Sequence, residues 1–212
     1  MKEHNILIFC AHSDDEAIGM GGTIARYAAE GKKVIKVVFS FGESSLPHFQ
    51  EHVVISRRLE ETELASRSIG IAKTIFWGMR DTKVKEDAEK INAVGKVRQQ
   101  LNEYRPEKVF VTSAIDPHPD HRAVNNAVLK AVDGMRKKYP VYEFEVWNVI
   151  RENKPVMYVD ITQFYKKKKS YMSLFESQWQ WIYALLIPAY IRTRLYGMKA
   201  GCKYAEKFYK VR

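Results

Sequence analysis

Short runs of apolar residues alternate with longer segments of helical spacing along most of this 212-residue chain. The first run, residues 5–11, shows no alternation of polar and apolar side chains, which is typical of a strand that is buried on both faces. Further strands are predicted at residues 33–39, 74–76, 108–112, 142–147 and 156–159. Helices are predicted at residues 18–30, 56–69, 86–104 and 123–135. Strands that alternate with helices predict a mostly parallel sheet with helices on both faces.

This order of elements predicts the α/β fold class, and in particular a Rossmann-like three-layer sandwich. We expect one domain, residues 1–212, because a domain of this length buries about 70% of the surface that its unfolded chain exposes. Residues 160–212 are predicted to form a C-terminal helical extension of that domain. Ligands of such folds bind beyond the carboxyl ends of the strands, so functional side chains are expected directly after them.

Positive charge is in excess, with 35 Lys and Arg against 25 Asp and Glu and a formal net charge of +10. Four consecutive lysines occupy residues 166–169. Such an excess suits nucleic acid, an anionic membrane surface, an anionic substrate or a solvated helix face, and charge alone does not choose among them. Because no nucleic-acid-binding motif accompanies the basic residues, we predict no nucleic-acid partner.

The two cysteines, Cys10 and Cys202, lie far apart in the sequence and predict free thiols in a reducing compartment. The apolar run near the N-terminus is too short for the apolar region of a signal peptide followed by a small-residue cleavage site. Both observations predict a cytoplasmic protein.

The first polar motif, A-H-S-D-D-E at residues 11–16, directly follows the first predicted strand. A dinucleotide-binding protein would have a glycine-rich turn at this place, but the nearest glycine is Gly19, which comes too late. The motif instead supplies one imidazole and three carboxylates. A turn that separates His12 and Asp15 by three residues can point both at one metal ion, while Asp14 points at whatever that ion holds.

The second polar motif, D-P-H-P-D-H-R at residues 116–122, also follows a predicted strand. One histidine of this motif, with His12 and Asp15, completes a set of two nitrogen ligands and one oxygen ligand. That set is typical of a catalytic zinc site with one position left open for water. Zinc acidifies a water at that position, so the pair of motifs predicts a hydrolytic metal site.

The remaining polar side chains of the two motifs suit catalytic tasks. Asp14 can accept the proton of the water, and His118 can donate to the leaving amine or to the oxyanion. Asp120 can orient His118. The structural alternative is that the histidines cap a strand end and the helix that starts near Pro119. Either motif alone favours that alternative, whereas the two motifs together favour a metal site.

In both motifs the chain resembles the PIG-L family of N-acetylglucosaminyl deacetylases, whose members are also called LmbE-like proteins. The family's A-H-P-D-D-E corresponds to residues 11–16, its G-G-T-I-A to residues 21–25, and its H-P-D-H to residues 118–121. Further similarity lies at Arg58, Glu61 and residues 69–70, 160–162, 177–178 and 205–208. The resemblance therefore covers nearly the whole chain. Ser13 stands where the family motif has proline, which removes a turn restraint but no ligand.

The resemblance implies a zinc-dependent N-deacetylase, which hydrolyses the linear amide of an N-acetylglucosamine-type amino sugar. It implies that His12, Asp15 and His121 bind zinc. It further implies that Asp14 is the general base and His118 the general acid. Because a site with two nitrogens and one oxygen also accepts other divalent metals, Fe2+ is an alternative to zinc.

The resemblance also bears on the substrate, which is expected to be a small-molecule or lipid-linked amino sugar. Arg58 is expected to contact the sugar or a neighbouring acidic group. Two other functions stay open. A zinc amidase of a sugar-thiol conjugate would use the same ligands, whereas a basic binding module on a Rossmann-like scaffold would carry no stoichiometric zinc.

The most apolar stretch of the chain is residues 178–196. Pro188 interrupts it and Arg192 and Arg194 follow closely, so it is not predicted to span a bilayer, which takes about 20 apolar residues. One interpretation is a buried core helix or a subunit contact in a homo-oligomer. The other is a peripheral membrane contact, because its tryptophans and tyrosines favour a membrane interface and nearby basic residues attract anionic lipids.

Overall fold

A computed structural model of the chain describes residues 4–45, 48–147, 149–150 and 153–212, except for the side chains of Ser45, Gln180 and Trp181. Within these residues, seven strands form one sheet in the order β3-β2-β1-β4-β5-β7-β6. The strands are β1 (Asn5–Cys10), β2 (Lys33–Ser40), β3 (Ile71–Met79), β4 (Lys108–Thr112), β5 (Val141–Phe144), β6 (Val156–Asp160) and β7 (Ala205–Lys210). Strands β3, β2, β1, β4 and β5 pair in parallel, and β7 is antiparallel to both of its neighbours. The prediction of a mostly parallel sheet is confirmed.

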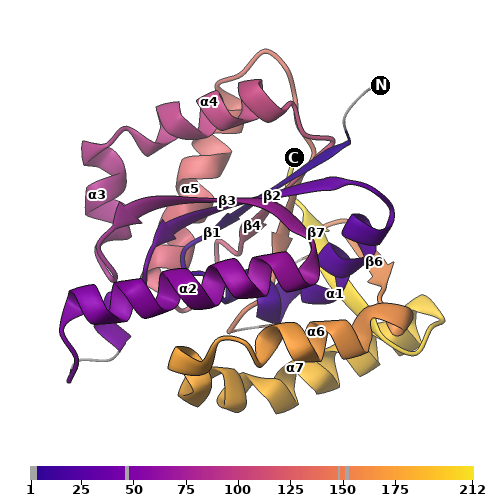
Figure 1. Ribbon diagram of the computed structural model, residues 1–212. Helices are drawn as coiled ribbons and strands as arrows, with labels where there is room; N and C mark the ends of the chain where they lie inside the picture. Colours follow the sequence, from indigo (N-terminus) through magenta and orange to yellow (C-terminus); the bar gives the residue numbers. More distant parts are fainter. Residues whose placement is uncertain (1–3, 46–47, 148, 151–152) are drawn as a thin grey trace.

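Helices cover both faces of the sheet, as Figure 1 shows. One face carries α1 (Asp15–Ala29), α2 (Glu51–Ile69), α6 (Tyr165–Met172) and α7 (Trp179–Ala200), and the other carries α3 (Val84–Lys90), α4 (Ala93–Tyr104) and α5 (Pro119–Asp133). Alternate residues of β1 enter opposite cores, since Ile6 and Ile8 pack with α1 whereas Leu7 and Phe9 pack with α4 and α5. The three-layer sandwich and the strand buried on both faces are therefore confirmed.

Several helices differ from their predicted bounds. The predicted helix at residues 86–104 is two helices, broken at Asn92, whose φ of 52° is left-handed. The Asn92 side chain accepts a hydrogen bond from the Gly95 N–H at 3.2 Å and caps α4. Apolar spacing continues across both helices, so periodicity does not reveal the break. Helices α1, α2 and α5 begin earlier than predicted. The first turns of α1 and α5 contain polar residues, 15–16 and 120–122 respectively, which carry no apolar periodicity.

The C-terminal segment differs from the predicted helical extension. Helices α6 and α7 are present, but residues 205–210 form β7, which lies between β5 and β6. Glu206 of this strand is buried because it forms an ion pair with Lys168, with Nζ 2.6 Å from Oε1. One lysine of the run at residues 166–169 is therefore part of the core, whereas the other three are exposed. Sequence periodicity does not anticipate a strand whose buried face carries a paired charge.

The buried Lys168–Glu206 pair also forms hydrogen bonds with backbone groups at a kink in α1. The helix is kinked at Met20, where φ is −148°. The carboxylate of Glu206 accepts hydrogen bonds from the N–H groups of Gly22 at 3.1 Å and Thr23 at 2.7 Å. The Lys168 ammonium donates to the carbonyl oxygen of Ile18 at 2.7 Å. Backbone groups that the kink exposes are thus satisfied inside the protein.

The strand order reverses between β1 and β4, because β2 and β3 lie on one side of β1 and β5 lies on the far side of β4. In open parallel sheets, ligands bind beyond the carboxyl ends of the strands at this point. Both polar motifs begin there. Among the described residues, no helix combines the length and apolar character that a membrane span requires.

Candidate active site

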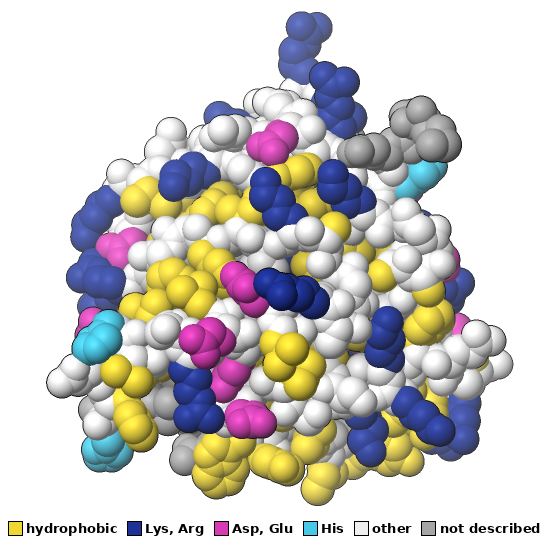
Figure 2. Space-filling model, viewed as in Figure 1, with side chains coloured by type: hydrophobic (Ala, Val, Ile, Leu, Met, Phe, Trp, Pro, Cys, Tyr) yellow, Lys and Arg dark blue, Asp and Glu magenta, His cyan; other side chains and the backbone are white. Residues whose placement is uncertain are grey.

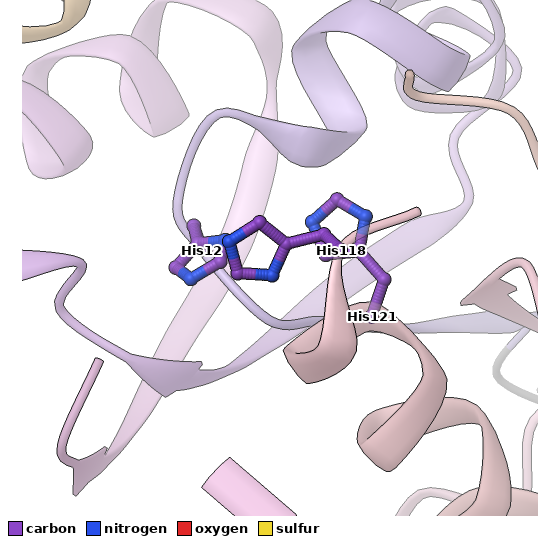
Figure 3. A group of neighbouring side chains, drawn as sticks. All are labelled: His12, His118 and His121. Atoms are coloured by element: carbon purple, nitrogen blue, oxygen red, sulfur yellow. The ribbon is translucent and has the colours of Figure 1, made fainter. Parts of the chain in front are cut away.

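The two polar motifs meet at the carboxyl ends of β1 and β4. His12 lies in the turn that joins β1 to α1, and His118 and His121 lie at the start of α5. Figure 3 shows their three rings grouped together. The ring centroids are 4.9 Å apart for His12 and His118, 4.9 Å for His118 and His121, and 5.5 Å for His12 and His121. The structure therefore brings together histidines from two distant parts of the sequence.

Asp15 presents one carboxylate oxygen to two of these histidines. Its Oδ2 accepts hydrogen bonds from the N–H groups of Ala11 and His12, both at 2.9 Å, which holds the side chain in place. Its Oδ1 lies 3.0 Å from Nε2 of His121 and 3.8 Å from Nδ1 of His12. Ligand atoms around a tetrahedral zinc ion are roughly 3.4 Å apart, so both distances are close to those between ligands of one ion.

Each of these two histidines has a second carboxylate at its other ring nitrogen. Asp116 Oδ1 lies 3.0 Å from Nδ1 of His121, and Asp81 Oδ1 lies 3.1 Å from Nε2 of His12. Histidines that bind metal commonly donate their other ring N–H to a carboxylate, which fixes the tautomer and raises the basicity of the ligand. Asp116 and Asp81 are therefore placed to orient the two candidate histidine ligands.

The electrostatics of the cluster favour a cation. His121 is fully buried, and neither of its ring nitrogens makes a contact with hydrogen-bond geometry. Burial lowers the pKa of His121, but the carboxylates of Asp15 and Asp116 outweigh it and raise that pKa to about 9. Burial raises the pKa of Asp15, but His121 and His12 outweigh it and hold that pKa well below its usual range. A buried carboxylate and an unsatisfied imidazole are the groups that a divalent metal would satisfy.

The donor atoms of the three histidines, His12, His118 and His121, lie within 4.8 Å of one another. A second group with the same property comprises His12, His118, Asp81 and Asp120. Its carboxylates are already occupied by backbone donors. Both Asp81 and Asp120 accept the N–H of Thr82, at 2.9 and 2.7 Å, and Asp120 also accepts the N–H of Val84 at 3.3 Å. Because Oδ1 of Asp15 has no such donor, the set of His12, Asp15 and His121 is better suited to a metal ion.

Asp14 lies beside the candidate metal ligands. With its amide nitrogen facing this carboxylate, Gln178 donates to Oδ2 of Asp14 at 2.6 Å. Burial and the neighbouring Asp15 raise the pKa of Asp14 to about 6, against the lowering effect of His12 and Arg58. A carboxylate with a pKa in this range can both accept and return a proton near neutral pH.

His118 is oriented by the backbone of α5. Its Nδ1 accepts a hydrogen bond from the Asp120 N–H at 3.2 Å, so His118 is the N-cap of the helix. The predicted orienting contact between Asp120 and His118 is thus made by the backbone N–H of Asp120. The Asp120 carboxylate instead accepts hydrogen bonds from the backbone N–H groups of Thr82 and Val84. An Nδ1 that accepts a hydrogen bond leaves the ring proton on Nε2. Burial and the nearby His12 and His121 lower the pKa of His118.

The profile of the PIG-L family, described as GlcNAc-PI de-N-acetylase, matches residues 7–132. This match covers more than half of the chain and includes both polar motifs. The chain belongs to the PIG-L family.

Individual relatives agree with this assignment. The chain is 31% identical over 161 residues to a 1D-myo-inositol 2-acetamido-2-deoxy-alpha-D-glucopyranoside deacetylase of Mycobacteroides abscessus, covering 63% of this chain and 57% of that protein. It is 26% identical over 222 residues to a diacetylchitobiose deacetylase of Thermococcus kodakarensis, covering 95% of this chain and 80% of that protein. The chain thus spans little more than half the length of the first of these relatives.

Similarity of fold extends to a protein with another reaction. The structure of the 4-carboxy-2-hydroxymuconate hydratase of Pseudomonas putida matches with a TM-score of 0.82 at 24% identity, covering 99% of this chain and 96% of that one. At this identity the likeness shows the fold alone. A PIG-L-like fold therefore does not by itself specify the reaction, which has to be argued from the site.

A cavity of about 320 Å³ opens beside the candidate ligands of this PIG-L protein. Its lining comprises His12, Asp14, Asp15, Ile18, Gly42, Ser44, Arg58, Asp81, Thr82, His118, Val146, Trp147 and Gln178. The volume lies at the lower end of the range for small-molecule sites. The cavity lining thus combines acidic and imidazole groups with the apolar side chains of Val146 and Trp147.

Arg58 reaches this cavity from α2. Its side chain is buried, and Nη1 donates to the carbonyl oxygen of Phe41 at 2.8 Å. The next residue, Gly42, has a φ of 70°, and a Cβ there would lie 2.0 Å from Nη1 of Arg58. Only glycine allows both this backbone conformation and the close approach of the guanidinium. The structure therefore places the predicted substrate-binding arginine in the same cavity as the two motifs.

Three residues of the site escaped sequence reasoning. Asp116 opens the second motif and could have been assigned from its place before the histidines. Gln178 lies in a region of family similarity but carries no chemical signal of its own. Asp81 follows β3 without any motif, next to Thr82, whose φ of 63° is unusual for a β-branched residue.

A fully buried ion pair between Lys36 and Glu16 anchors the first polar motif. Lys36 of β2 places Nζ 2.6 Å from Oε1 of Glu16 and donates to the carbonyl oxygen of Ser13 at 3.3 Å. The Tyr171 hydroxyl of α6 and the Cys10 thiol also donate to the Glu16 carboxylate. The turn that carries the acidic residues of the motif is thereby tied to β2 and α6.

Replacing Lys36 with methionine is expected to lower the free energy of unfolding by about 3–5 kcal/mol, because Glu16 would remain buried without its cation. Urea unfolding followed by circular dichroism measures this change. Lys33→Met, on the exposed part of the same strand, is the matched control and should change stability by less than about 0.5 kcal/mol. Equal effects of the two variants would contradict a supporting role for the pair.

Proposed function

We propose that this PIG-L protein is a metal-dependent hydrolase that removes the N-acetyl group from an N-acetylglucosamine-type amino sugar. The observation that carries the proposal is that Oδ1 of Asp15 lies 3.8 Å from Nδ1 of His12 and 3.0 Å from Nε2 of His121, with Asp14 in the adjoining cavity of about 320 Å³. The names of the relatives from Mycobacteroides abscessus and Thermococcus kodakarensis support the same reaction on acetylated amino sugars.

The proposed metal ligands are Nδ1 of His12, Oδ1 of Asp15 and Nε2 of His121. Two nitrogens and one oxygen with an open position are the ligand set of hydrolytic zinc, and Fe2+ is the alternative. When bound, the metal would act as the Lewis acid for the attacking water and the acetamide carbonyl. Asp81 and Asp116 would hold the two imidazoles in the tautomers that metal binding needs.

Asp14 is the proposed proton carrier. Its carboxylate would accept a proton from the attacking water as the oxygen bonds to the acetyl carbon. The same proton would pass to the sugar nitrogen as the C–N bond breaks, which yields the free amine and acetic acid. Gln178 holds the Asp14 carboxylate by its hydrogen bond, so the base stays aimed into the cavity. One group that accepts and then returns a proton balances the reaction without a second acid.

His118 was assigned as general acid from the family resemblance, and the geometry favours the other role that its chemistry allows. Because Nδ1 accepts the Asp120 N–H, the neutral ring carries its proton on Nε2. A neutral imidazole is a good hydrogen-bond donor and a very weak acid. We therefore propose that His118 donates to the oxyanion that forms on the acetyl carbonyl, a contribution that typically amounts to about a hundred- to a thousandfold in rate.

Substituting His118 distinguishes these two roles. His118→Ala is expected to lower kcat by about a hundredfold or more with the metal retained. His118→Gln should recover part of that loss, because an amide N–H can reach toward the oxyanion but cannot serve as an acid. Steady-state kinetics on both variants measures the difference. Equal loss in His118→Ala and His118→Gln would support proton donation instead.

Arg58 is the proposed contact for the sugar or for a neighbouring acidic group, since its side chain lines the cavity. The proposed substrate is a small-molecule or lipid-linked amino sugar. The cytoplasmic placement rests on Cys10 and Cys202, which are both free thiols in the structure.

Acetate release from a panel of N-acetylglucosaminides, measured with the zinc- and the iron-loaded protein, tests the proposed function. We expect release from at least one member and none from the metal-free protein. Hydration of an unsaturated acid without any acetate release would show that the site performs the other chemistry known on this fold. Cleavage of a sugar-thiol conjugate in preference to the acetylated sugar would favour the amidase.

A further inference from the structure

Helix α7 exposes large hydrophobic side chains along one side of its whole length. They are between 45% and 72% exposed: Trp179, Tyr183, Ile187, Tyr190, Ile191, Leu195 and Met198, here called the α7 stripe. The stripe contains half of the large hydrophobic side chains that are exposed in the described part of the chain. The opposite side of α7, with Ile182 and Leu185, is buried in the core. Packing in the core therefore accounts for the apolar residues on the buried side of α7, but not for those of the exposed stripe.

Basic residues surround the α7 stripe. Between residues 164 and 203 the sequence contains eight Lys and Arg and one acidic residue, Glu176. Three lysines of α6 are exposed, as are Lys199 and Lys203 at the far end of α7. Figure 2 shows hydrophobic side chains with Lys and Arg beside them along the lower edge of the molecule, where Figure 1 places α6 and α7. The surface is thus apolar along its centre and positively charged at its borders.

Two apolar hollows lie between α6 and α7. One of about 440 Å³ is lined by Phe175, Trp179 and Tyr183, and its charged lining residues are Lys169, Arg57 and Glu176. The other, of about 250 Å³, is lined by Tyr165, Ile187 and Tyr190 and again by Lys169. A hollow with apolar walls and a cation suits a chain with an anionic group at its end. These features suit lipids better than a flat protein surface.

We propose that the α7 stripe binds the surface of a membrane that contains anionic lipids, with α7 parallel to the bilayer plane. Its aromatic side chains and aliphatic side chains would enter the boundary between headgroups and acyl chains. The bordering Lys and Arg would attract the anionic headgroups, which contributes about 1 kcal/mol for each basic residue near the surface.

A second copy of the chain suits this surface less well. A two-fold dimer would place the stripe and its basic border against the same groups of the partner copy. Lys168 is buried with Glu206, so the border holds seven basic residues and one acidic residue, and the two copies would repel each other there. An anionic membrane supplies the missing opposite charge. Charge complementarity therefore selects the membrane as the occupant.

The catalytic cavity lies next to this surface. Gln178, which donates to Asp14, directly precedes Trp179, the first residue of the stripe. Arg192 of α7 donates to the carbonyl oxygen of Val146, which lines the cavity, at 3.1 Å. A protein bound through α7 would thus hold its cavity close to the headgroups of the membrane. The inference itself does not depend on the reaction, because it concerns only the binding surface.

Sedimentation with lipid vesicles tests the proposal. We expect binding to vesicles of phosphatidylcholine with phosphatidylglycerol at about 0.05 M salt, several times weaker binding at about 0.5 M salt, and little binding to phosphatidylcholine alone. The double variant Ile187→Glu, Met198→Glu should bind at least about tenfold more weakly, since both side chains are exposed and take no part in the core.

Leu64→Glu is the matched control, because Leu64 is 58% exposed on α2, away from the stripe, and should change vesicle binding by less than about twofold. Asp14→Asn should bind vesicles like the wild type, which separates this proposal from the proposed reaction. Absence of binding at low salt, or equal loss in Leu64→Glu, would overturn the proposal. A dimer in analytical ultracentrifugation that Ile187→Glu dissociates would instead assign the stripe to a contact between copies.

Discussion

Replacing His121 with alanine is expected to abolish both metal binding and activity. The side chain is fully buried with Nε2 3.0 Å from Oδ1 of Asp15, so its loss removes one of three proposed protein ligands and the nearest cationic neighbour of that oxygen. His12→Ala and Asp15→Ala are expected to behave in the same way. Elemental analysis of the purified variants, together with acetate release, measures both effects.

The surrounding residues provide graded controls for this prediction. Asp116→Asn keeps the ligand but weakens its orientation, so metal affinity should fall by about ten- to a hundredfold rather than vanish. His52→Ala, an exposed histidine of α2, should leave metal content and rate unchanged. If His121→Ala retained stoichiometric metal and full turnover, the proposed ligand set would be wrong.

Asp14→Asn is expected to keep the metal and to lose about a hundred- to ten-thousandfold in kcat. Asparagine has the shape of the carboxylate but cannot accept the proton of the attacking water. The oxygen of its side-chain amide can still accept the hydrogen bond of the Gln178 side chain, so the variant tests the base rather than the packing of the site. Single-turnover acetate release with a metal-loaded variant measures the change.

Thermal unfolding and metal content of Asp14→Asn provide the internal control, because both should remain close to the wild-type values. Gln178→Ala removes the hydrogen bond that holds Asp14 but leaves the carboxylate, and its loss of rate should be smaller than that of Asp14→Asn. A rate in Asp14→Asn within a few times that of the wild type would assign proton transfer to another group.

Much of the fold could be predicted from the sequence because its signals are local. The first strand, for example, reads as buried on both faces from its unbroken apolar run, and its alternate residues do enter both cores. The break at Asn92 shows the limit of such signals, since the apolar spacing continues across it. The strand at residues 205–210 shows another limit, because Glu206 is buried only through its pairing with Lys168.

The candidate site was predicted to the extent that its residues stand together in motifs. His12, Asp14 and Asp15 follow one strand, and His118 and His121 follow another. The structure brings all five together, with His121 buried behind the four that line the cavity. Their catalytic and ligand roles remain predictions for the variants above to test. The role of His118 illustrates the difference between residue and geometry, because only the hydrogen bond to its Nδ1 favours oxyanion binding over proton donation.

The sequence by itself determined the alternation of strands and helices, the carboxyl-end position of both motifs and the residue types that can hold a metal. These properties depend on spacing along the chain, which periodicity and turn chemistry record directly. Only the tertiary structure decided that Asp81 and Asp116 stand behind the two histidines and that Gln178 holds Asp14. Those contacts join residues that are distant in sequence, and they exist because the order of the strands brings separate loops together. A buried charge is stable only beside its partner, and the fold alone sets where that partner lies.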